Sequence, residues 1–195
     1  MKKTFFFIGG LLMSLFPAFS QTATGVRPLS IGDTMPDIVF DNIINYKTAS
    51  AKLSDFKGKL VILDFWNTHC GPCIASLPKM DSLQKHFGDK IQILPVSYEV
   101  SSVIKDFFAR PRFQHLQLPS ITEDKVLKRI FPHATAPHEV WIDGDGVVRA
   151  ITNDWQVSRA NIAAILDKRV IKMPVKQISP ENRAVPGKPL LLDGN

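Results

Sequence analysis

Residues 60–73 read LVILDFWNTHCGPC and join an apolar run to the only two cysteines of the chain. Leu60–Trp66 is nearly continuous in apolar and β-favouring residues, which is typical of a strand buried on both faces. From Cys73 to Phe87, apolar residues recur at three- and four-residue spacing, which predicts an amphipathic helix. The stretch therefore predicts a strand–turn–helix unit whose turn carries Cys70.

The rest of the chain alternates strand and helix patterns around this unit. Strands are expected at 38–40, 91–96, 138–142 and 147–151, an extended piece at 116–121, and helical segments at 100–109, 125–131 and 157–169. Asp143–Gly146 has the composition of a hairpin turn between the last two strands. This order predicts an α/β fold with a central mixed β-sheet flanked by helices on both faces.

The N-terminus has the pattern of a secretory signal. Basic residues precede the apolar run Phe5–Phe16, and small residues then indicate cleavage before Gln21. The run is shorter than the roughly 20 apolar residues that span a bilayer, and an uncleaved membrane anchor is the alternative. Residues 1–20 are therefore expected to be a signal peptide, and the protein is expected to be exported to the periplasm.

The remaining chain is expected to form one domain with irregular ends. Residues 21–30 are predicted to be a flexible lead-in, 31–170 the folded domain and 171–195 a proline-rich C-terminal tail. The net charge of the 195-residue chain is +6, and its basic residues are scattered without interleaved aromatics. We therefore expect no nucleic-acid binding, and we expect a monomer.

The placement of the two cysteines indicates chemistry more than architecture. Exported proteins commonly use disulfides as structural cross-links, which stabilise by closing long loops of the unfolded chain. A bridge between Cys70 and Cys73 closes almost no loop. The pair is therefore predicted to be a reversible dithiol/disulfide centre.

The turn predicts separate roles for the two sulfurs. If Cys70 lies at the helix N-terminus, the unpaired N–H groups and the helix dipole stabilise its thiolate, which is the attacking species in disulfide exchange. Cys73 lies one turn later on the same face, where it can resolve the mixed disulfide. Pro72 suits the first helical turn because it has no N–H to leave unpaired, and Gly71 completes the turn.

Other chemistries fit these residues less well. A zinc site needs a fourth ligand besides Cys70, Cys73 and His69, such as His133 or His138. Covalent haem attachment needs a His directly after the second Cys, where this chain has Ile. Inert core cysteines are disfavoured by the Gly-Pro between them at a strand–helix turn. No metal ligand is therefore assigned.

The sequence resembles the thioredoxin superfamily, and within it the exported TlpA/ResA-type disulfide reductases. The likeness covers about residues 31–170 and rests on Trp66-x-x-x-Cys70-Gly71-Pro72-Cys73 and on Pro78, which matches the proline inside the active-site helix of that family. It rests also on Ala136-Pro137, which matches the cis-proline loop before the hairpin. The resemblance implies a thioredoxin-like fold, a cis Ala136–Pro137 bond, and a loop that faces the dithiol and binds the substrate backbone.

Asp64 stands six residues before Cys70, where thioredoxins place a buried acid. An aspartate inside a buried strand is costly unless it is partnered or protonated, so its pKa is expected to be raised. Asp64 is therefore predicted to accept the Cys73 proton during resolution. An Asp64 that points to water is the alternative.

Several residues near the turn differ from the family pattern or have open roles. His69 replaces the Trp common before the first Cys, and when protonated it would favour the Cys70 thiolate. Ser76 stands where many cytochrome-maturation relatives carry Glu, which weakens a dedicated cytochrome c role. His133 and His138 flank the cis-proline loop, and Glu99 follows the strand at 91–96.

The expected function is an exported thiol-disulfide oxidoreductase, most simply a disulfide reductase. The resemblance implies disulfide-containing exported proteins, including apocytochrome c, as substrates and a membrane thiol as electron donor. No cofactor is expected beyond the Cys70/Cys73 pair. An oxidase or isomerase is the alternative within the class, and a copper metallochaperone or a non-catalytic binding module lies outside it.

Overall fold

A six-stranded mixed sheet in the order β2-β6-β5-β4-β7-β8 forms the centre of the computed structural model, which describes residues 27–169 and 173–176. The strands are β1 (Val39–Phe40), β2 (Ile43–Ile44), β3 (Ala51–Lys52), β4 (Leu60–Phe65), β5 (Ile91–Val96), β6 (Ser120–Ile121), β7 (His138–Ile142) and β8 (Val148–Thr152). β4 pairs with β5 in parallel and with β7 in antiparallel orientation. β1 and β3 form a separate two-stranded sheet.

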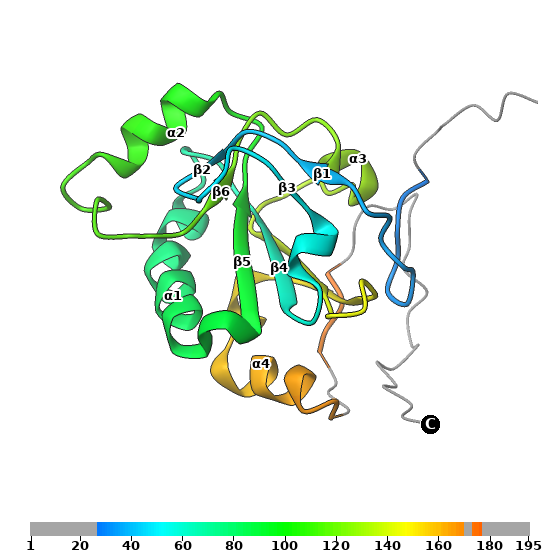
Figure 1. Ribbon diagram of the computed structural model, residues 1–195. Coiled ribbons are helices and arrows are strands. Elements are labelled where there is room, and N and C mark those ends of the chain that lie inside the picture. The colour runs from blue at the N-terminus through cyan, green and yellow to red at the C-terminus, as the bar shows by residue number, and fades with distance from the viewer. Residues whose placement is uncertain (1–26, 170–172, 177–195) are drawn as a thin grey trace, which may run out of the picture.

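Helices cover both faces of this sheet, as expected (Figure 1). They are α1 (Gly71–Phe87), α2 (Ser101–Phe108), α3 (Leu127–Ile130) and α4 (Arg159–Leu166), with 3-10 turns η1 (Leu53–Phe56), η2 (Gly88–Lys90) and η3 (Asp154–Gln156). Side chains of α1, α2 and α4 share one buried cluster with one face of the sheet. Side chains of α3, η1 and the β1–β3 sheet cover the other face. The α/β class with a mixed sheet is therefore confirmed.

The long elements agree closely with the sequence expectation. The strands at 91–96 and 138–142 have the expected bounds, whereas α1 begins two residues before the expected start at Cys73. Pro78 lies inside α1. Strand β2 was not expected, and it forms by pairing with β6, a partner far along the chain. Two residues are too short to show the alternation that marks a strand.

The packed chain extends beyond the residues assigned to the domain. Leu29 is buried, and its N–H donates to the Ile130 carbonyl. Lys176, in the expected tail, donates its N–H to the Ile151 carbonyl at the end of the sheet. The predicted signal peptide (1–20) and most of the lead-in and tail lie outside the described residues. Among the described residues, no helix has the length and apolar character needed to cross a membrane.

Candidate active site

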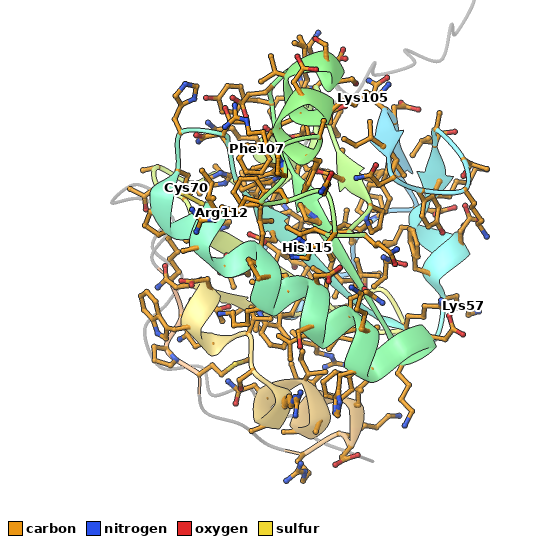
Figure 2. The ribbon with its side chains drawn as sticks, turned by 90° about the vertical axis from the view of Figure 1, so that its left-hand side faces the viewer. Lys57, Cys70, Lys105, Phe107, Arg112 and His115 are labelled. Atoms are coloured by element: carbon orange, nitrogen blue, oxygen red, sulfur yellow. A yellow bond between two sulfur atoms is a disulfide. The ribbon has the colours of Figure 1, made fainter. Side chains whose placement is uncertain are left out.

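Cys70 lies at the N-terminal end of α1 (Figure 2), and Cys73 lies in the first turn of this helix, which follows β4 in the chain. Cys70 is the N-cap residue, Gly71 and Pro72 form the first turn, and the Cys73 N–H donates to Cys70 Sγ at 3.3 Å. The sulfurs form a disulfide with a Cα–Cα distance of 5.3 Å. A helix N-terminus that already directs an N–H at Cys70 Sγ favours the thiolate once the bond is reduced.

The two sulfurs differ in exposure. Cys70 is partly exposed, whereas Cys73 is fully buried in the cluster between α1 and the sheet. The buried Ser76 hydroxyl donates to the Cys73 carbonyl at 2.8 Å, within the first turns of the helix. Only Cys70 is therefore open to a substrate disulfide, and Cys73 is placed to react with Cys70.

Trp66, predicted as part of the active-site turn, is a core residue at the base of that turn. Its side chain is buried and lies against Phe107 and Phe108, with ring centroids 5.1 and 5.7 Å away. Contacts of this kind link the end of β4 to α2. The turn therefore stands on a packed aromatic base.

Glu99 holds the turn from the neighbouring strand end. Its carboxylate accepts the Thr68 N–H at 2.8 Å, the Thr68 hydroxyl at 2.6 Å and the Ser97 hydroxyl at 3.1 Å. The side chain is only 10% exposed, so these bonds are shielded from water. The sequence placed Glu99 only after a strand, and its contact with Thr68 arises because β4 and β5 are parallel neighbours.

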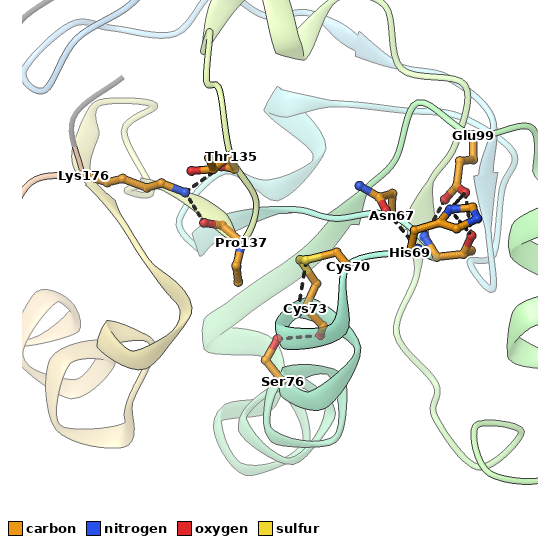
Figure 3. The surroundings of a disulfide bond; sticks show 10 residues. Asn67, His69, Cys70, Cys73, Ser76, Glu99, Thr135, Pro137 and Lys176 are labelled. Atoms are coloured by element: carbon orange, nitrogen blue, oxygen red, sulfur yellow. Dashed lines mark hydrogen bonds and ion pairs between the residues drawn. A yellow bond between two sulfur atoms is a disulfide. The ribbon is translucent and has the colours of Figure 1, made fainter. Parts of the chain in front are cut away.

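His69 is directed toward Glu99, away from the disulfide (Figure 3). Its side chain is 86% exposed, and Nδ1 lies 3.6 Å from the nearer Glu99 oxygen. Asn67, two residues before His69, also holds the turn, because its side-chain oxygen accepts the His69 N–H at 2.9 Å. The structure therefore places His69 in the turn, and its effect on Cys70 stays a prediction.

The Ala136–Pro137 bond is cis, as the resemblance implies. Ala136 and Cys70 pack against the same buried cluster, and the loop faces the N-terminal end of α1 (Figure 3). Lys176 contacts this loop from the C-terminal segment: its ammonium donates to the carbonyls of Thr135 and Pro137. Sequence reasoning missed Lys176, because its contact with the loop spans about forty residues of chain.

A small hollow of about 100 Å³ lies beside the cis-proline loop, lined by side chains that include Phe65, Tyr98 and His133. His133 stacks on His138 with the ring centroids 4.5 Å apart. His138 is fully buried, and burial lowers its pKa to about 2. The His138 ring is therefore neutral and out of reach of a substrate, whereas His133 borders the hollow.

Asp64 is fully buried on β4, and neither carboxylate oxygen has a hydrogen-bond partner in the part of the chain that the structure describes. Burial, reinforced by the charge of Asp154 and opposed by that of Lys79, raises the pKa of Asp64 to about 7. Its neighbours on the same strand face, Ile62 and Trp66, belong to the cluster that contains Cys73. The alternative in which Asp64 points to water is therefore wrong.

A second buried acid, Glu139 on β7, was not singled out from the sequence. It stands directly opposite Asp64 in the antiparallel register, and within residues 27–169 and 173–176 its carboxylate also has no hydrogen-bond partner. The alternation within His138–Ile142 showed a strand, but the pairing of β4 with β7 determines what Glu139 faces. Within the described residues, no three His, Cys, Asp or Glu side chains are grouped to hold a metal ion.

Comparison with known proteins agrees with this geometry. Residues 31–151 match the AhpC/TSA family. Thiol-disulfide oxidoreductase ResA of Geobacillus kaustophilus is 32% identical over 139 residues, covering 70% of this chain and 76% of the relative. A thiol:disulfide interchange protein DsbE structure from Chlorobium tepidum is 26% identical, with a TM-score of 0.57, covering 71% of this chain and 94% of that one.

A third similar protein is the exposed lipoprotein thioredoxin Etrx1 of Streptococcus pneumoniae. Its structure is 25% identical, with a TM-score of 0.52, and the match covers 61% of this chain and 91% of that one. The solved structures share the thioredoxin-like fold, and the ResA relatives share the type of chemistry that the Cys70–Cys73 disulfide performs. The chain belongs to the AhpC/TSA family and is a thiol-disulfide oxidoreductase similar to ResA.

Proposed function

We propose that this protein works outside the cytoplasm as a disulfide reductase, transferring two electrons from its Cys70/Cys73 dithiol to disulfides of other exported proteins. The observation that carries the proposal is the difference between the two sulfurs. Cys70 is a partly exposed N-cap whose sulfur accepts an N–H, and Cys73 is fully buried behind it. This arrangement suits one attacking and one resolving thiol.

In the first step, the Cys70 thiolate attacks one sulfur of a substrate disulfide. A bond forms between Cys70 and that sulfur, and the other substrate sulfur leaves as a thiolate. The helix N-terminus stabilises the attacking thiolate. The bonds between Glu99 and Thr68 keep the turn in position during this attack.

In the second step, Cys73 loses its proton and attacks Cys70 Sγ. The Cys70–Cys73 disulfide forms, and the second substrate sulfur leaves, so that the substrate has gained two electrons. Asp64 is proposed to accept the Cys73 proton, because its raised pKa of about 7 makes it a base suited to neutral pH.

The cis-proline loop is proposed to bind the substrate backbone. Pro137 lies opposite the N-terminal end of α1 (Figure 3). The adjacent hollow, which Ala136 lines, offers space for a side chain next to the scissile disulfide. Lys176 ties down the carbonyls on both sides of the cis bond. A fixed loop presents its remaining polar groups to a substrate at lower entropic cost.

The expected partners are disulfide-containing exported proteins, including apocytochrome c, and a membrane thiol that returns the protein to the dithiol form. The signal pattern of residues 1–20 supports export. The similar Streptococcus pneumoniae protein is described as an exposed lipoprotein. Ser76, which occupies the position where cytochrome-maturation relatives carry Glu, favours a broader substrate range over cytochrome c alone.

The test is insulin reduction by the purified protein in the presence of a small dithiol. Wild type should accelerate the precipitation of the insulin chains, and Cys70→Ser should abolish the acceleration. Cys73→Ser should attack once and remain as a mixed disulfide, which mass spectrometry detects. Activity that survives Cys70→Ser contradicts the assignment of the attacking sulfur.

The direction of electron flow is tested by the reduction potential of the Cys70/Cys73 pair, measured by equilibration with glutathione. A potential well below that of the glutathione couple supports the reductase. A potential well above it refutes the reductase and favours the oxidase.

A further inference from the structure

Glu139 and Asp64 form a buried pair of carboxyl groups in the layer beneath α1. They are directly opposed in the antiparallel register of β4 and β7, so their side chains lie on the same face of the sheet. Directly opposed residues have Cβ atoms about 5 Å apart, within reach of a shared proton. Both side chains are 0% exposed.

The described residues offer neither acid a partner that would stabilise two negative charges. Among them, none hydrogen-bonds any of the four carboxylate oxygens. The charged groups that act on the pair are Lys79 from α1, Asp154 from η3 and Lys176 from the C-terminal segment. The Lys79 ammonium donates to the Asp154 carbonyl at 2.6 Å, and the Lys176 ammonium donates to the Thr135 carbonyl in the cis-proline loop. Neither cation is hydrogen-bonded to Asp64 or Glu139.

Two adjacent carboxylates in a buried site cannot both ionise at moderate cost. Desolvation disfavours each charge, and a like charge nearby disfavours the second charge further. Burial raises the pKa of Asp64 to about 7, and burial together with the charge of Asp64 raises that of Glu139 to about 10. Between these values the pair holds one proton and carries one negative charge.

We propose that Glu139 and Asp64 act as one proton-holding pair, which keeps a single proton at neutral pH and takes a second from the Cys73 thiol as the mixed disulfide is resolved. This inference rests on the proposed function and adds Glu139 to it. The thiol proton passes to the ionised carboxyl, and the resulting Cys73 thiolate attacks Cys70 Sγ and displaces the substrate thiolate. The protonated pair later returns one proton to water, so protons and electrons balance without another reactant.

Two of the charged groups that act on the pair are partly exposed. Lys79 and Asp154 form an ion pair at 3.7 Å beside the acids, and their side chains are 39% and 22% exposed. The set of charged groups around Asp64 and Glu139 therefore includes members that reach the surface. Glu139 shares the proton of the pair with Asp64 and accepts the thiol proton itself when Asp64 is replaced.

The first measurement is the infrared carbonyl band of a protonated carboxyl group in the oxidised protein, at a pH midway between about 7 and about 10. Wild type should show the band, and Glu139→Gln should lose it, because Asp64 alone is ionised at that pH. Asp64→Asn should keep the band but move its midpoint to lower pH, because the Asp64 charge no longer raises the pKa of Glu139.

A matched control removes another buried acid, which lies on α1. Asp81 is 5% exposed, and its carboxylate accepts the Gln117 N–H at 3.0 Å and bonds Lys85 at 2.6 Å. Because both of its carboxylate oxygens have partners, Asp81→Asn should leave the band unchanged. If Glu139→Gln does not fold, the band shift in Asp64→Asn tests the same coupling.

The second measurement is the resolution rate of a mixed disulfide between Cys70 and a chromogenic aryl thiol, as a function of pH. Asp64→Asn should retain a pH-dependent rate through Glu139, and the double variant Asp64→Asn/Glu139→Gln should lose it, slowing by about a hundredfold. Identical profiles for the single and double variants, or a band that survives Glu139→Gln, overturn the proposal.

The two proposals fail in different ways. The infrared band is measured on the oxidised protein without a substrate, and the resolution rate is measured on a preformed mixed disulfide. If wild type shows the infrared band but does not reduce insulin, the proposed reductase function is refuted and the proposed carboxyl pair is not. Insulin reduction without the band refutes the pair and leaves the reductase standing.

Discussion

Replacing Asp64 by asparagine should make the folded protein more stable at alkaline pH. Asp64 is fully buried, no described residue hydrogen-bonds its carboxylate, and burial raises its pKa from 3.8 to about 7. An acid with a raised pKa in the folded state destabilises that state as the pH rises, because the unfolded chain ionises first. The penalty begins near pH 3.8 and is complete above about pH 7.

The expected gain in the free energy of unfolding follows from the rise in the pKa of Asp64. A rise of about three pKa units at about 1.36 kcal/mol each corresponds to about 4 kcal/mol of lost stability above pH 7. Asparagine leaves a buried amide in the same unpartnered position, which costs about 1–3 kcal/mol. The net gain in the free energy of unfolding should therefore be about 1–3 kcal/mol at alkaline pH.

The assay is urea unfolding of the oxidised proteins at a pH below 3.8 and at a pH above 7. The gain of Asp64→Asn over wild type should be present at the alkaline pH and absent at the acid pH, where both states of wild type are protonated. Asp81→Asn serves as the control and should show no gain, because Asp81 already has partners. An equal gain at both pH values, or a loss at alkaline pH, refutes the reasoning.

Three further predictions concern the contacts around the site. Two carboxylate oxygens of Glu99 hold Thr68, and Glu99→Gln leaves only one acceptor there. This variant should lower the free energy of unfolding by about 1–2 kcal/mol and slow insulin reduction. Unchanged values in both assays contradict the prediction. Lys176→Met removes the ammonium that bonds the cis-proline loop, so it should raise KM for insulin more than KM for a small disulfide. Lys176→Arg should restore KM. An equal effect on both substrates contradicts the proposed role of Lys176 in holding the loop. Gly144→Ala would place a Cβ 2.7 Å from the Gly58 Cα, so it should destabilise by about 1–3 kcal/mol in thermal unfolding, and a neutral result would show that the two turns can separate.

Much of the fold could be predicted because long elements carry their own periodicity. The strands at 91–96 and 138–142 and the helix after the cysteines show repeated apolar spacing over several residues. Strand β2 could not be predicted in this way, because two residues show no period and its pairing with β6 depends on the sheet. The start of α1 shifted by two residues because Gly71 and Pro72 carry no apolar signal.

The same distinction between local pattern and tertiary pairing applies to the site. Local spacing within the chain predicted the Cys70/Cys73 centre and its place at a strand–helix turn, because each depends on residues within a few positions. It left open whether Asp64 is buried or points to water, which the packing of the sheet decided. Only the tertiary structure decided that Glu139 faces Asp64, that Glu99 holds Thr68 and that Lys176 bonds the cis-proline loop. These contacts join residues separated by about 30 to 75 positions. The reason is physical: a cysteine pair one helical turn apart is placed by the backbone itself, whereas the charge next to a buried acid depends on which strands become neighbours in the sheet.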